Sequence, residues 1–189
     1  MFPVVATLLA GVFERWELPL PKAKCSQCRH GFTCYPAGIY PRRQYQLDVV
    51  AWATAPVALG GTSAAETARA TRAGATSVRR WVSWIAALAE PRDVVALAAR
   101  IDPDSPAGTG LSSVAAAPGA RRAAAAAVIV ALEHLGAALV RGGLRLTMRS
   151  GLGRVLGWQH QAHGEAVLLT RPPSRLSPAM ALWREAALA

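Results

Sequence analysis

Two cysteines with the spacing C-x-x-C are the first residues whose types and spacing could do chemistry. Cys25 and Cys28 stand in the stretch KAKCSQCRHGFTCYP, which holds all three cysteines of the chain. A tight turn with this spacing presents two thiolates to one zinc ion, and tetrahedral zinc requires four ligands. His30 and Cys34 are the nearest further donors, but one very short turn would then have to surround the metal. We therefore favour a half-site, with Cys25 and Cys28 as the metal ligands, over a closed four-ligand site.

A second group of metal-binding side chains lies in the segment WQHQAHGE. On a helix, His160 and His163 would share a face and Glu165 would lie off it, so we interpret the segment as ordinary surface. The nuclease of a transposase would require three carboxylates around two magnesium ions. After the linker the chain offers Glu133, Glu165 and Glu185, and none of them follows a β-branched strand. Phosphate-binding loops and nucleophile elbows are also missing, so we expect no enzyme activity.

The charge of the chain is strongly basic. It carries 21 Lys and Arg against 11 Asp and Glu, a formal net charge of +10. A GC-rich genome explains why Arg replaces Lys, but it does not explain the excess of bases over acids. Guanidinium groups fit phosphates and guanine edges, so a polyanion is the expected partner. Because the cysteines cluster instead of spreading as in a disulfide framework, a reducing cytoplasm is the expected location.

The segment AAETARATRAGATSVRRWVSWI predicts two helices joined by a short turn. Ser63 and Glu66 form a capping-box arrangement at the start of the first helix. On a wheel of 100° per residue, the second helix has an apolar face. This face consists of Val78, Trp81, Val82, Ile85 and Leu88.

The opposite face and the N-terminus of the second helix are polar and basic. They carry Thr76, Ser77, Arg79, Arg80 and Ser83. Hydroxyl groups at a helix N-terminus cap the helix, and the N–H groups there can face a phosphate. An apolar back and an Arg/Ser/Thr front are what a helix needs to read the major groove, so these residues are the DNA-binding candidates.

The two helices resemble the helix-turn-helix of bacterial regulators and transposases. Ala68 is the small residue that lets the helices cross closely. The turn glycine of such motifs usually follows four residues later, where this chain has Arg72, and Gly74 comes two residues after that. We therefore expect a rearranged turn. The alternative is an ordinary helical hairpin with a solvated arginine face.

A longer stretch, WELPLPKAKCSQCRHGFTCYPAGIYPRRQYQLDVVAWA, is followed by VRRW. It resembles the second half of the zinc ribbon, and then the helix-turn-helix, at the start of bacterial insertion-sequence transposases and related uncharacterised proteins. The resemblance covers about residues 14–90 and implies zinc and double-stranded DNA as partners. The family pattern has an earlier C-x-x-C that is missing here, through decay of that knuckle or a true start codon further upstream. Cys34 matches a non-ligand position, so we assign it to packing.

The expected fold is mainly α. A small degenerate zinc-ribbon-like β segment precedes the helix-turn-helix, and a C-terminal helical region follows. The expected divisions are a partial ribbon at 1–40, a helix-turn-helix region at 41–101, a linker at 102–119, and an Ala/Arg-rich helical region of unknown role at 120–189. The linker is rich in Pro, Gly, Asp and Ser.

Two further helical segments frame the helix-turn-helix, and the later of them is RDVVALAARI. One is expected to start at Pro41 and to close at Pro56 and the pair Gly60-Gly61. After residue 140, RGGLRLTMRSGLGRVLGWQH has too many glycines for any element to be predicted. Its GLGRVLG part lacks the preceding strand of a dinucleotide-binding loop.

The apolar run AAAAAVIVALEHLGAALV predicts a helix from about Ala120 to Val140. Glu133 and His134 interrupt the run, and burying them in a bilayer would be costly, so we expect no membrane span. One stripe of this helix is apolar at i, i+4, i+7 and i+11. It consists of Val128, Leu132, Leu135 and Leu139. Such a stripe is more often core than an oligomer interface.

The sequence thus predicts a cytoplasmic DNA-binding helix-turn-helix protein related to mobile-element proteins, without its own nuclease domain. Four further arginines are expected to contact phosphates: Arg42, Arg43, Arg69 and Arg72. One alternative is a protein-interaction or homo-oligomerisation module built on the helix at 120–140. Another is the non-catalytic front end of an interrupted transposase.

Overall fold

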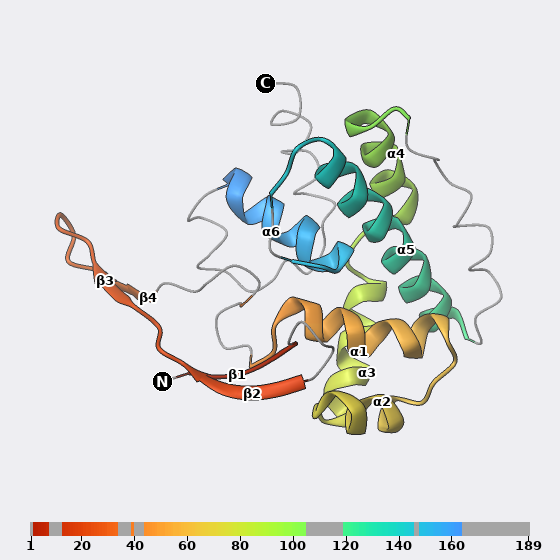
Figure 1. Cartoon of the computed structure of the whole chain (residues 1–189), viewed down its shortest axis with the longest axis horizontal. Helices are drawn as coiled ribbons and strands as arrows, with labels where there is room; N and C mark the ends of the chain where they lie inside the picture. The colour runs from red at the N-terminus through yellow and green to blue at the C-terminus, as the bar shows by residue number, and fades with distance from the viewer. Residues whose placement is uncertain are drawn as a thin grey trace.

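Helices dominate the structure, a computed structural model that describes residues 2–7, 13–33, 39, 44–104, 119–145 and 148–163 (Figure 1). The helices are α1 (Leu47–Leu59), α2 (Ala64–Thr71), α3 (Ala75–Ala86), α4 (Pro91–Ile101), α5 (Ala120–Arg141) and α6 (Gly151–His163). The strands are β1 (Phe2–Thr7), β2 (Phe13–Leu18), β3 (Lys22–Lys24) and β4 (Gly31–Thr33). The prediction of a mainly α fold is confirmed.

The strands form two separate antiparallel hairpins before the first helix. β1 pairs with β2, and β3 pairs with β4 so that Lys24 lies opposite Gly31 across the cysteine turn. β2 ends at Leu18, directly before Pro19, and the β1 strand was not predicted. The β3–β4 hairpin projects away from the helices, whereas β1 lies beside α1 (Figure 1).

α1 differs from the predicted first helix at both ends. It begins at Leu47, six residues after the expected start at Pro41, and it runs through Pro56 instead of closing there. A proline removes one backbone hydrogen bond, and here the loss falls near the exposed end of the helix. The helix closes at Gly60, whose N–H donates to the carbonyl of Pro56 over 3.0 Å, and Gly61 follows with a φ of 70°. The glycine pair therefore ends the helix as predicted.

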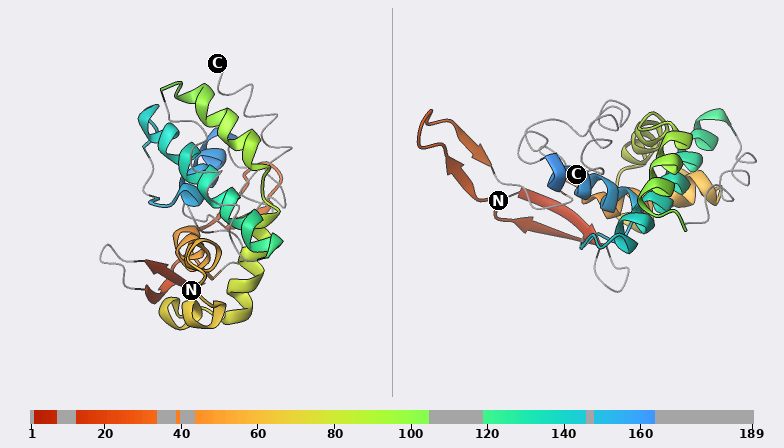
Figure 2. Two further views of the ribbon diagram at one scale, coloured as in Figure 1. Left: turned by 90° about the vertical axis from the view of Figure 1, so that its right-hand side faces the viewer. Right: turned by 90° about the horizontal axis from the view of Figure 1, so that it is seen from above.

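α5 is the central helix of the body, and it packs against α1, α3, α4 and α6 (Figure 2). Its apolar stripe is no more than 5% exposed: Val128, Leu132, Leu135 and Leu139. The stripe belongs to the core, as the sequence favoured. A single cluster of buried side chains joins helices on both sides of the expected linker. Asp102, at the start of that linker, pairs with Arg141 at the end of α5, while residues 105–118 lie outside the described part.

By length and composition alone, α5 is the one helix of the described residues that could cross a membrane. However, 56% of its most apolar window is buried inside the protein. Core helices meet the same criterion of length and hydropathy, so this finding carries no argument for a membrane span.

α6 lies in the glycine-rich stretch for which the sequence predicted no element. Two glycines let α6 cross α5 at very short range. A Cβ on Gly151 would lie 2.5 Å from the carbonyl oxygen of Leu132, and one on Gly136 would lie 2.9 Å from the Cα of Gly151. The glycines therefore serve packing between helices.

A buried carboxylate joins α1 to the start of α6. Asp48 is 4% exposed. It accepts hydrogen bonds from the N–H of Arg149 (3.1 Å), the N–H of Ser150 (3.0 Å) and the hydroxyl of Ser150 (2.5 Å). A Cβ on Gly153 would lie 2.6 Å from this carboxylate, so glycine is required there too. Asp48 thus holds Ser150, whose own hydroxyl oxygen caps α6 by accepting the N–H of Gly153 over 3.0 Å.

Candidate nucleic-acid interface

α2 and α3 lie next to each other and both pack on α1. α2 begins as predicted, because the Ser63 hydroxyl oxygen accepts a hydrogen bond from the N–H of Glu66 over 3.1 Å. Ala68 is buried in the core between these helices. The three helices therefore form a packed unit that holds α3 in one orientation.

The turn between α2 and α3 consists of Arg72, Ala73 and Gly74. Arg72 has φ 53° and ψ 22°, the left-handed conformation that favours glycine. The N–H groups of Arg72 and Ala73 both donate to the carbonyl of Ala68. Gly74 has an ordinary extended φ of −77°. The expected rearrangement of the turn is therefore not needed, because Arg72 itself adopts the glycine-like conformation.

The apolar face of α3 is buried as the helical wheel predicted. Val78, Trp81, Val82 and Ile85 are each at most 6% exposed, and Leu88 beyond the helix end is fully buried. The ring of Tyr45 packs edge-on against Trp81, with ring centroids 4.7 Å apart. The core contacts of this face fix which side of α3 faces solvent.

The other face of α3 is exposed. Thr76, Arg79 and Arg80 are exposed, whereas Ser77 and Ser83 are half-buried. The hydroxyl of Ser83 donates to the backbone carbonyl of Arg79 over 3.1 Å, so its proton is used within the helix. The structure thus brings the five predicted residues onto one side and the N-terminal end of a single helix.

Two of the four predicted phosphate-contacting arginines can be placed. Arg69 on α2 and Arg72 in the turn are both exposed. Arg42 and Arg43 lie outside the described residues.

A cavity of about 580 Å³ lies between the start of α2, the polar face of α3 and the start of α5. Arg79 and Ser83 line it from α3, and Arg121 and Arg122 line it from α5. Sequence reasoning missed the two arginines of α5 because they lie 38 or more positions after Arg79 and Ser83 along the chain. The local sequence signal that could have indicated them is a pair of arginines at the start of a helix that has no capping side chain.

The two candidate metal ligands lie at the tip of the β3–β4 hairpin. The N–H of Cys25 donates to the carbonyl of His30 over 2.9 Å, and the N–H of Arg29 donates to the carbonyl of Cys25 over 3.0 Å. Backbone N–H groups of Cys28 and Gln27, and the Cys28 thiol, donate to the Cys25 sulfur and lower the pKa of its thiol. A turn that directs N–H groups at a thiolate suits a metal ligand.

Two cysteines could supply at most two of the four ligands that tetrahedral zinc requires. Within the described residues, no group of three or more His, Cys, Asp or Glu side chains lies close enough to hold a metal. Cys34 and Glu165 lie outside the described residues, as do the side chains of His160 and His163 on α6. Cys25 and Cys28 therefore fit two of the four positions that zinc requires.

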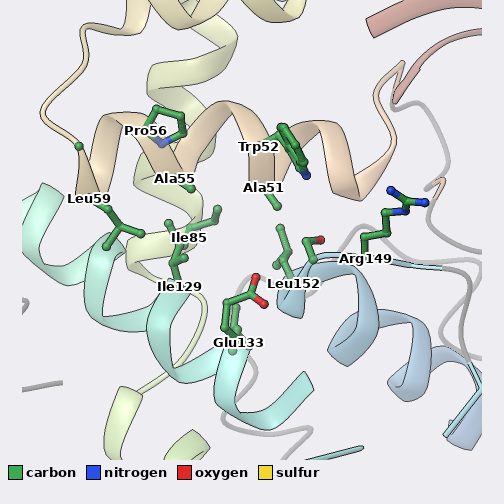
Figure 3. A pocket seen from close by; sticks show the side chains of 13 residues that line it. Ala51, Trp52, Ala55, Pro56, Leu59, Ile85, Ile129, Glu133, Arg149 and Leu152 are labelled. Atoms are coloured by element: carbon green, nitrogen blue, oxygen red, sulfur yellow. The ribbon is translucent and has the colours of Figure 1, made fainter. Parts of the chain in front are cut away.

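An apolar cavity of about 600 Å³ lies between α1, α5 and the start of α6 (Figure 3). Trp52 and Leu59, which are about half exposed, form part of its wall on α1. Glu133 reaches toward it from α5, but one of its carboxylate oxygens accepts the N–H of Gly151 over 2.7 Å. The clearest polar contact of Glu133 thus caps α6. The sequence had not indicated this cavity.

The arrangement of the described helices defines a mainly helical protein with one exposed, basic helix face. Comparison with protein-family models, curated proteins and solved structures gives no match to this chain.

Proposed function

We propose that this protein binds double-stranded DNA through α2 and α3, which act as a helix-turn-helix. The observation that carries the proposal is the two-sided character of α3. Val78 is fully buried, while Arg79 and Arg80, which follow it directly in the sequence, are exposed. A helix that the core holds in one orientation and that presents arginines to solvent fits the major groove.

In this proposal the residues of α3 read base edges. Arg80 would place its planar guanidinium on a guanine, and Thr76 would contact a base near the N-terminus of the helix. Arg79 stands beside Arg80 on the same exposed face. Ser77 and Ser83 complete this surface with hydroxyl oxygens.

The exposed arginines around α3 would hold the DNA backbone. Arg69 and Arg72 carry no sequence information themselves, but they would fix the register of α3 through phosphate contacts. Arg42 and Arg43 would add to this set.

We propose further that the protein is related to mobile-element proteins, works in the cytoplasm and has no nuclease of its own. The support is the order of motifs in the sequence, with Cys25 and Cys28 providing half of a zinc-ribbon site before the helix-turn-helix. If an interrupted transposase is the source, a reading frame next to the gene will encode the catalytic part.

The test is a titration of the whole chain onto random-sequence duplex DNA at two or more salt concentrations. If about six phosphates are neutralised, the logarithm of the association constant will fall with log salt at a slope of about −5. The variant Arg79→Ala/Arg80→Ala will bind more weakly. The matched control is Arg92→Ala/Arg100→Ala, which removes two exposed arginines from α4. A folded protein that does not bind, or binds independently of salt, would refute the proposal.

A further inference from the structure

The cavity between α3 and the start of α5 gathers positive charge. Arg79, Arg121 and Arg122 line it, and none of the described residues that line it is Asp or Glu. Within the described part of the chain, the ion pair is the one between Arg141 and Asp102. None of the three guanidinium groups of the cavity therefore pairs with a described carboxylate. An open cavity of about 580 Å³ with three cationic groups is suited to an anion.

The start of α5 is also unfavourable for the helix itself. Its N-cap is Gly119, with no side-chain hydrogen bond to the first turn, and that turn contains no acidic residue. Arg121 and Arg122 place two positive charges at the positive end of the helix dipole. By contrast, α1, α2 and α4 each carry an acid in the first turn. α3 and α6 lack such an acid too, but among the described helices α5 alone has two arginines in its first turn.

The opposite wall of the cavity adds a hydrogen-bond donor of another kind, a hydroxyl group. Ser63 caps α2, and its hydroxyl oxygen accepts the N–H of Glu66, so the hydroxyl proton is left to donate. The uncapped N–H groups at the start of α5 are likewise donors without helical partners. The cavity therefore combines charge with directional hydrogen-bond donors.

We propose that this cavity binds one phosphate of the DNA backbone beside the groove that α3 enters. This inference rests on the proposed function. Arg79 belongs both to the exposed face of α3 and to the cavity wall. A phosphate held there would consequently flank the bases that α3 reads. Because α5 is the central helix of the core, this contact would fix the position of the DNA relative to the core.

The first test is Arg121→Ala/Arg122→Ala in the DNA titration. Loss of this one phosphate contact reduces the magnitude of the salt slope by about 1 and weakens binding to all duplex sequences to a similar extent. Arg92→Ala/Arg100→Ala on α4 is the matched control and keeps the wild-type slope. A wild-type slope for the α5 variant, while Arg79→Ala/Arg80→Ala loses binding, overturns this inference alone. If the wild-type protein does not bind DNA, both proposals fail.

The second test separates binding from stability. Arg121→Glu places a negative charge at the positive end of α5, so the melting temperature rises by about 2–4 °C while DNA affinity falls. A purely structural role for Arg121 would make the variant less stable and leave DNA affinity unchanged, which contradicts the proposal. Pyrophosphate, tested alone by thermal shift, distinguishes the source of the phosphate. Stabilisation by pyrophosphate without DNA binding assigns a small-anion site and overturns the DNA assignment.

Discussion

Arg72 holds a backbone conformation that glycine would adopt without steric cost. A left-handed conformation costs a residue with a Cβ about 1 kcal/mol, and Arg72 bears it with φ 53°. Its side chain is exposed, so core packing does not explain the choice of arginine. A phosphate contact in the proposed complex does explain it, because an exposed guanidinium next to α3 would touch the DNA backbone.

Two substitutions of Arg72 separate the effect of backbone strain on stability from the effect of the side chain on DNA binding. Arg72→Gly relieves the backbone strain, so the free energy of unfolding should rise by about 0.5–1 kcal/mol. Arg72→Val, which keeps the strain and adds β-branching, should lower it. Urea denaturation measures both variants, and the same DNA titration should show weaker binding for each. A loss of stability in Arg72→Gly equal to that in Arg72→Val would show that contacts of the arginine side chain stabilise the turn.

The faces of α3 were predictable from sequence, but its surroundings were not. The 3.6-residue period of Val78, Trp81 and Ile85 determines which side is buried, and the structure agrees. The conformation of Arg72 was not foreseen, because sequence statistics indicate where glycine is preferred and not where another residue tolerates its conformation. Arg121 was also missed, because only the packing of α5 brings it to α3.

Among the elements, α6 shows why a glycine-rich segment can be a core helix. Glycine lowers intrinsic helix propensity, so the pattern predicted no element there. Close packing outweighs that preference, since α6 buries Leu152, Val155 and Leu156 against the rest of the core. The buried carboxylate of Asp48 holds the start of the helix through bonds across 101 and 102 residues of sequence. Such long-range hydrogen bonds leave no local pattern in the sequence.

The close crossing of α5 and α6 predicts the effect of adding a methyl group between the two helices. Gly151→Ala places a methyl group 2.5 Å from the Leu132 carbonyl and 2.6 Å from the Glu133 backbone, atoms that cannot rotate away. The free energy of unfolding should fall by about 2–3 kcal/mol. Gly31→Ala is the control, because its Cβ would meet nothing within 4 Å, and it should be nearly neutral. Equal denaturation curves for the two variants would mean that α6 does not pack on α5 as described.

The described residues form a helical body, a β1–β2 hairpin beside α1, and a β3–β4 hairpin that stands apart from the helices (Figure 1). The expected helical regions before and after residues 102–119 share one cluster of buried side chains, with α5 at its centre. None of the described side chains of the β3–β4 hairpin belongs to that cluster, and the side chain of Phe32 lies outside the described part. Since hydrophobic burial is the main source of folding stability, the helical body should not depend on the hairpin.

This separation predicts the outcome of removing the metal ligands. Cys25→Ser/Cys28→Ser should leave the thermal unfolding of the helices, followed by circular dichroism, within about 0.5 kcal/mol of wild type, as expected for surface changes. The same variant should lose any zinc bound by the wild-type chain, measured by elemental analysis after gel filtration. Cys34→Ser is the matched control and should keep the zinc, because the family resemblance assigns that residue to packing. Zinc retained in the double variant but lost in Cys34→Ser would move the site away from the knuckle. A large loss of helical stability in the double variant would instead show that the hairpin supports the core, contrary to the separation seen in the structure.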